Sequence, residues 1–124
     1  MQLERRFYSR HSMQQMIEII IAKQTFLTSS LNISLNGIEI EATECLVNAL
    51  CSGTVHIRPA QCNVNVTLSN GQVISLIGRL IVKRRLNQSN YLLGLKFIDT
   101  TQIEQLQLRS IIAQLVTNPT KGLN

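Results

Sequence analysis

The length, composition and charge of this chain narrow what it can be. Its 124 residues fit one domain with a real core, and 44 % hydrophobic residues with 4 % aromatic residues and no Trp predict an ordered aliphatic core rather than disorder. Twelve Lys and Arg residues against seven Asp and Glu residues give a net charge of +5, which suits an anionic ligand, nucleic acid or an anionic membrane surface. No segment approaches the roughly 20 apolar residues of a membrane-spanning helix, and no signal peptide is recognisable. We therefore expect a cytoplasmic protein with no membrane insertion.

The first half of the chain predicts a polar arm followed by three strands. The segment from Met1 to His11 is polar and lacks periodicity, whereas Met13 to Ala22 is apolar and rich in β-branched residues, which favours a strand. A strand from Thr25 to Leu31 leads to a polar turn, and Gly37 to Ala42 alternates as a half-buried strand does. The pattern from Thr43 to Gly53 fits a short helical turn or an irregular connection.

The second half predicts further strands joined by short turns. Thr54 to Arg58 reads as a short strand that ends at a proline, and Asn63 to Leu68 alternates again. Ser69 to Gln72 contains Asn-Gly between two strands, which is the strongest turn signal in the chain. Val73 to Arg85 is a long strand, and Tyr91 to Ile98 returns beside it.

From Thr100 onward the apolar period becomes helical. Thr100 or Thr101 is suited to cap a helix, and Glu104 lies in its first turn. The apolar positions at helical spacing are Ile103, Leu106, Leu108, Ile111, Ile112, Leu115 and Val116. The pattern predicts a helix of roughly four turns that ends before Pro119.

These elements predict a mainly β fold. About six antiparallel strands and one terminal helix imply a small six-stranded antiparallel β-barrel with a C-terminal α-helix that covers its open end. We expect residues 1–12 to form a flexible arginine-bearing arm, residues 13–117 the barrel with its helix, and residues 118–124 a tail.

Two polar clusters in the first third of the chain are suited to bind a phosphate-bearing purine ligand. Arg5, Arg6 and Arg10 supply planar guanidinium groups, which fit a phosphate or the O6/N7 edge of guanine and can stack on a base. Asn32 and Ser34 supply short neutral donors and acceptors in the segment that ends at Gly37, where the missing side chain permits a close backbone approach.

The two clusters resemble the signature of the PilZ domain family of bacterial receptors for cyclic diguanylate (cyclic di-GMP). Arg6 and Arg10 match the pattern Arg-x-x-x-Arg, and Asn32, Ser34 and Gly37 match Asp/Asn-x-Ser-x-x-Gly. Tyr91 to Ile98 resembles the last strand of that family, with Gly94 shortly before Phe97 and a helix after it. The resemblance spans the chain from about Glu4 to about Val116.

The resemblance implies a role for each site residue. Arg6 and Arg10 are expected to bind the phosphates and stack on guanine, with help from Arg5, and Asn32 and Ser34 to meet the guanine edge. Gly37 is expected to shape the turn that presents them. Asn32 stands where Asp is commoner in the family, so the chain lacks there a carboxylate that accepts from guanine N1 and N2. The resemblance also implies a protein partner in motility, pilus, biofilm or virulence control.

Three other functions remain open from the sequence. A PilZ-like adaptor that binds no nucleotide is one, although such domains usually lack the arginine pair. A basic β-barrel for single-stranded nucleic acid is a second, suggested by Lys83, Arg84 and Arg85, although the chain has only five aromatic residues for base stacking. An enzyme has least support, because the chain lacks a nucleophile elbow, a glycine-rich phosphate loop and a paired-carboxylate motif.

The cysteines indicate neither a metal site nor a disulfide framework. Cys45, Cys51 and Cys62 form an odd set without a Cys-x-x-Cys pair. Reduced thiols are the expected state in a cytosolic chain. We therefore expect no metal site, and the lack of catalytic motifs leads us to expect no catalytic residue and no cofactor.

Overall fold

The computed structural model describes residues 11–12, 16–52, 60–68 and 70–117. The predicted strand from Thr54 to Arg58 and the three arginines of the arm lie outside these residues. The elements, in chain order, are β1 (His11–Ser12), β2 (Met16–Ile21), β3 (Gln24–Ile33), β4 (Gly37–Thr43), α1 (Glu44–Ser52), β5 (Gln61–Thr67), β6 (Val73–Arg85), β7 (Asn90–Ile98) and α2 (Gln102–Thr117).

The strands form a closed antiparallel barrel. Six of them follow the order β3-β2-β5-β6-β7-β4, and an additional pairing between β3 and β4 closes the sheet. The short strand β1 pairs with the end of β3, on the same edge that β2 occupies farther along that strand. Closure leaves no long unpaired edge among these six strands, which removes a route to aggregation. The predicted mainly β class and six-stranded barrel are confirmed.

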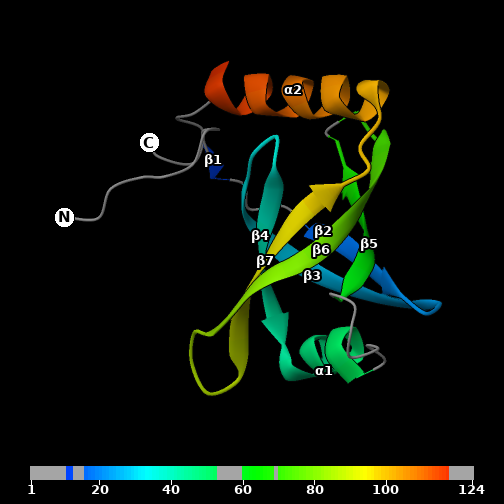
Figure 1. Ribbon diagram of the computed structural model, residues 1–124. Helices are drawn as coiled ribbons and strands as arrows, with labels where there is room; N and C mark the ends of the chain where they lie inside the picture. The colour runs from blue at the N-terminus through cyan, green and yellow to red at the C-terminus, as the bar shows by residue number, and fades with distance from the viewer. Residues whose placement is uncertain (1–10, 13–15, 53–59, 69, 118–124) are drawn as a thin grey trace.

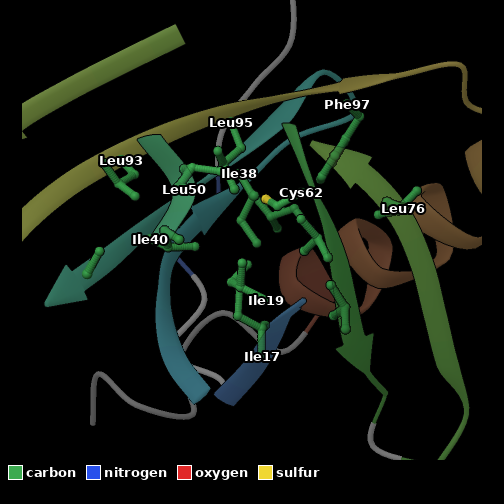
Figure 2. Packing of buried hydrophobic residues seen from close by; sticks show 14 of the residues in the cluster. Ile17, Ile19, Ile38, Ile40, Leu50, Cys62, Leu76, Leu93, Leu95 and Phe97 are labelled. Carbon is green, nitrogen blue, oxygen red and sulfur yellow. The ribbon is translucent and has the colours of Figure 1, made fainter. Parts of the chain in front are cut away.

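The barrel core is aliphatic, as the composition predicts. Alternate residues on each strand point inward, for example Ile17 and Ile19 on β2 and Ile38 and Ile40 on β4, and all four side chains are at most 2 % exposed. Figure 2 shows these side chains converging from different strands, with Phe97 as the aromatic member of the cluster. Burial of this kind contributes roughly 25 cal/mol per Å² of apolar surface and is the main source of stability for such a barrel.

The two helices lie at opposite ends of the barrel (Figure 1). Helix α1 forms in the segment from Thr43 to Gly53, for which the sequence fits either a helical turn or an irregular connection. It buries Leu46, Val47 and Leu50, and the hydroxyl of Thr43 accepts a hydrogen bond from the Leu46 amide at 3.4 Å.

Helix α2 begins with the predicted cap. The Glu104 amide donates to Thr101 Oγ1 at 3.1 Å, and the Thr101 amide donates to Glu104 Oε1 at 3.0 Å, so the two residues form a capping box. Leu108 and Ile111 are buried against the barrel, but Ile103 and Leu106 are 69 % and 64 % exposed. At about 100° per residue these two positions lie on the far side of the helix, so only part of the predicted apolar set closes the fold.

Two tight turns show where the local sequence is informative and where it is not. The predicted Asn-Gly turn is present, with Gly71 at a φ of +88° and Asn70 Oδ1 accepting from the Gln72 amide at 2.9 Å. The turn between β2 and β3 lies where the two predicted strands meet, but no turn signal marks it, because it consists of Ala22 and Lys23. Both residues have positive φ, at 48° and 72°, where Asn and Gly are the usual choices.

Candidate functional site

The predicted turn joins β3 to β4 at the α2 end of the barrel (Figure 1). The Ser34 hydroxyl accepts hydrogen bonds from the amides of Asn36 and Gly37 at 3.1 and 3.3 Å, and the Ser34 amide donates to the Gly37 carbonyl at 2.9 Å. Ser34 is only 5 % exposed. Its hydroxyl is therefore engaged inside the turn, and in this structure Ser34 fixes the shape of the segment.

Asn32 lies on β3 rather than in the turn. The strand continues to Ile33, so the turn is limited to residues 34–36. Asn32 is half-buried, and its side-chain amide donates to Glu39 Oε1 on β4 at 2.6 Å. Glu39 is also the register partner of Asn32. A carboxylate thus lies directly beside the position where the family more often carries Asp.

Gly37 is required by a close approach of two strands. It is the first residue of β4 and pairs with Lys96 on β7. A Cβ atom on Gly37 would lie 2.3 Å from the Leu95 carbonyl oxygen, which is part of the backbone and cannot turn aside. The Phe97 amide also donates to the Asn36 carbonyl at 2.9 Å. These contacts hold the turn against β7.

The close approach brings two cations to the predicted site that the sequence analysis did not single out. Lys96 on β7 is the register partner of both Gly37 on β4 and Arg79 on β6. Both side chains are half-buried and alternate along their strands with inward-facing residues such as Leu95 and Phe97, so they lie on the outer face. In the sequence, the charged residue Lys96 between Leu95 and Phe97 already indicated an outward-facing position. The pairing with Arg79 was not indicated there, because a register shift between Leu80 and Val82 displaces the two strands.

The strand β1 connects the predicted arm to this face. His11 pairs with Ile33, and Ser12 pairs with Asn32. Arg10 directly precedes His11 in the chain. The point where the arm joins the barrel therefore lies beside Asn32, although Arg5, Arg6 and Arg10 are themselves outside the described residues.

Other chemistry is sparse in the part of the chain that the structure describes. It contains no group of three or more His, Cys, Asp or Glu side chains arranged to hold a metal ion. It also contains no helix whose length and hydropathy would let it cross a membrane. Cys45 is exposed, Cys51 is half-buried and Cys62 is buried, and all three are free. Burial raises the pKa of the Cys62 thiol to about 12, so this group stays protonated at neutral pH.

Comparison with solved structures finds the same fold in proteins whose structures contain c-di-GMP. The PilZ domain of YcgR from Escherichia coli with c-di-GMP superposes with a TM-score of 0.73 at 16 % identity, covering 96 % of this chain and 97 % of that one. The MrkH–c-di-GMP complex of K. pneumonia gives 0.71 at 14 % identity, over 97 % of this chain and 55 % of MrkH. The PlzA protein of Borreliella burgdorferi in complex with c-di-GMP gives 0.56 at 18 % identity, over 86 % of this chain and 47 % of PlzA. The chain thus spans about half the length of the last two proteins, and at these identities the likeness establishes the fold.

The sequence comparisons give the family. No curated protein sequence matches the chain. The sequence profile described as "PilZ domain" matches residues 4–114, which include the three arginines of the arm, the Asn32 to Gly37 segment, the whole barrel and most of α2. The chain therefore belongs to the PilZ domain family.

Proposed function

We propose that this protein is a receptor for cyclic di-GMP. Arg6 and Arg10 bind the phosphates and stack on guanine, and Arg5 assists them. Asn32 meets the guanine edge, and Glu39 beside it supplies a carboxylate of the kind that accepts from guanine N1 and N2. Family membership and the likeness to solved receptors support this function.

The observation that carries the proposal is the pairing of Ser12 with Asn32. It brings two motifs that are separate in the sequence to one place on the barrel. An extended chain spans at most about 3.5 Å per residue, so the guanidinium groups of Arg6 and Arg10 can reach a ligand held against Asn32. A site divided between an arm and a barrel face can grip a ligand from two sides.

The proposed output is ordering of the N-terminal arm on ligand binding. A ligand that contacts both the arm and the barrel favours the state in which the two are held together, and so shifts the population toward it. The ordered arm then presents a new surface to a protein partner of motility, pilus, biofilm or virulence control. We further propose that the receptor acts in the cytoplasm.

Titration calorimetry with cyclic di-GMP tests the function. The intact protein is expected to bind with saturation, and the double variant Arg6→Ala/Arg10→Ala is expected to give no heat while its circular dichroism and unfolding midpoint stay unchanged. GTP and cyclic GMP serve as controls for a general affinity for guanine nucleotides. Normal binding by the double variant would remove the arm from the mechanism.

A second titration separates this proposal from its alternatives. Absence of cyclic di-GMP binding by the intact protein would contradict the receptor function and favour an adaptor that acts through proteins alone. Strongly salt-dependent binding of single-stranded RNA or DNA, without competition from cyclic di-GMP, would favour a nucleic-acid-binding barrel instead.

A further inference from the structure

Arg79 and Lys96 form a pair of like charges on the outer face of the barrel. Their Cα atoms are register partners on β6 and β7, so the two side chains leave neighbouring strands on the same side. The row continues to Gly37 on β4 and to Gln61 on β5, which are the other partners of Lys96 and Arg79. One of these flanking residues has no side chain and the other is uncharged, so the row itself carries no acidic group.

This arrangement is electrostatically unfavourable without an anion. Like charges directly opposite each other destabilise a pair of strands, whereas opposite charges stabilise it. Within the described residues, neither the Arg79 nor the Lys96 side chain has a hydrogen-bond or ion-pair partner. Glu39 is the nearest acidic residue in the strand register, but it belongs to the next row of the face, where it pairs with Gly94 and accepts from Asn32. The two cations are thus left facing each other and the space outside the barrel.

Their position links them to the proposed ligand. Lys96 is the neighbour of Gly37, and Gly37 closes the segment that begins at Asn32. The absence of a side chain on Gly37 lets the turn pack directly against the backbone of Leu95 and Lys96, so the turn and Lys96 are immediate neighbours. An anion held by Lys96 and Arg79 would therefore lie next to a guanine that meets Asn32 and Glu39.

We propose that Arg79 and Lys96 form a barrel-side binding pair for a phosphodiester group of cyclic di-GMP. This inference rests on the proposed function and assigns it residues outside the two sequence motifs. The ligand carries two phosphates, so the arm arginines and the barrel pair each have an anionic group to bind. Guanidinium and ammonium groups are the usual partners of phosphate, and their hydrogen bonds to it are charge-assisted.

Calorimetry on charge-neutralised variants tests the pair. Arg79→Gln and Lys96→Gln are each expected to weaken cyclic di-GMP binding by about tenfold, the loss typical of one charge-assisted hydrogen bond. Lys83→Gln and Arg84→Gln are matched controls, because they remove the same charge from exposed positions farther along β6. Both controls are expected to bind within about twofold of the wild type, since a distant surface charge is screened. Equal affinity in the site variants and the controls would overturn the proposal.

A second measurement keeps this inference separate from the proposed function. Thermal unfolding is followed with inorganic pyrophosphate as the probe, which carries phosphate groups without guanine. The wild type and the two control variants are expected to be stabilised by pyrophosphate, and Arg79→Gln and Lys96→Gln much less. If the wild type binds no cyclic di-GMP but shows this pattern, the function fails and the anion pair stands. If pyrophosphate stabilises all five proteins equally or none of them, the pair fails whatever the dinucleotide does.

Discussion

The cations on β6 and β7 differ in whether they have partners within the described part of the chain. In the hairpin between β6 and β7, the Arg85 guanidinium donates to the carbonyls of Asn87 and Gln88 at 3.4 and 2.9 Å, donates to the Tyr91 hydroxyl, and lies 4.6 Å from the centroid of the Tyr91 ring. On the barrel face, Arg79 and Lys96 oppose each other without such partners among the described residues. The same residue types therefore stabilise the fold at one place and are left available at the other.

The difference shows that the number of charges in a segment is a poor guide to which cations lack a partner within the described residues. Lys83, Arg84 and Arg85 form the densest basic run of the described chain, and they suggested a nucleic-acid surface. One of the three, Arg85, instead closes its own hairpin. The more telling pair is separated by many residues in the sequence and becomes adjacent only through the strand register.

The largest expected effect comes from breaking the contact that builds the barrel face. Gly37→Ala places a methyl group against the Leu95 carbonyl, so the turn must move away from β7. We expect a loss of about 3 kcal/mol in the free energy of unfolding, measured by urea denaturation, together with weakened ligand binding.

Gly71→Ala is the matched control for this change. Gly71 has a positive φ but no atom within 4 Å of an added Cβ, so the variant carries backbone strain without a collision. It is expected to lose about 1 kcal/mol and to keep its ligand affinity. An equal loss in both variants would mean that the Leu95 contact has no special importance.

A smaller effect is expected where the hairpin cation is removed. Arg85→Ala loses the hydrogen bonds to the loop carbonyls and the contact with Tyr91, all of them exposed to solvent. We expect the protein to lose about 1 kcal/mol of stability in the same urea assay and to bind cyclic di-GMP as the wild type does. Weakened binding would show that the hairpin also belongs to the site.

One substitution at the Arg79–Lys96 pair is expected to raise the stability of the protein, whereas the substitutions above lower it. Lys96→Glu replaces a pair of like charges with an Arg79–Glu pair across two strands. The free protein is expected to gain about 0.5 kcal/mol of stability, measured by urea denaturation at low salt, while its affinity for cyclic di-GMP falls. A variant that became less stable would show that the two cations do not repel each other measurably.

The smallest effect at neutral pH concerns the barrel interior behind the cation pair. Cys62 is the register partner of Gly78, the residue before Arg79, and its thiol points into the core. Because its folded pKa is raised from 9.0 to about 12, it favours the folded state below pH 9 and loses this contribution as the pH rises toward 12. The stability difference between the wild type and Cys62→Val is therefore expected to be constant below pH 9 and to shift in favour of the variant above it.

Thiol labelling gives an independent check that Cys62 lies inside a closed barrel. At neutral pH a thiol reagent is expected to modify the exposed Cys45 quickly and Cys62 only as the protein unfolds. Fast labelling of Cys62 in the native protein would contradict the closed barrel. Faster labelling in Gly37→Ala than in the wild type would confirm that this variant makes the barrel interior more accessible.

The elements that the sequence predicts well are those in which local pattern and tertiary environment agree. The predicted long strand from Val73 to Arg85 is β6 with its observed bounds, and Asn70-Gly71 marks a true turn. Ala22 and Lys23 carry no turn signal, since the flanking strands impose their positive φ values. The segment after Thr43 forms α1 because its apolar residues pack against the end of the barrel. This packing depends on the tertiary structure and cannot be read from the local sequence.

In the candidate site, too, some residues could be predicted from the local sequence and others only from the folded sheet. Asn32, Ser34 and Gly37 stand out in the sequence because they form a compact motif. The pairing of Arg79 with Lys96 depends on which strands are neighbours and on the register shift near Leu80, and both properties belong to the folded sheet. The position of Glu39 beside Asn32 likewise follows from the register of β3 with β4.

The shortness of β1 has a consequence for the reversibility of the proposed signal. The strand joins the barrel through only two residue pairs, and a backbone hydrogen bond contributes about 1 kcal/mol net. Its docking equilibrium is therefore shallow, and a ligand that binds the docked state about 100-fold better would shift that equilibrium 100-fold. Such an equilibrium is also reversible, so in the proposed receptor the docked population would fall with the messenger concentration as well as rise with it.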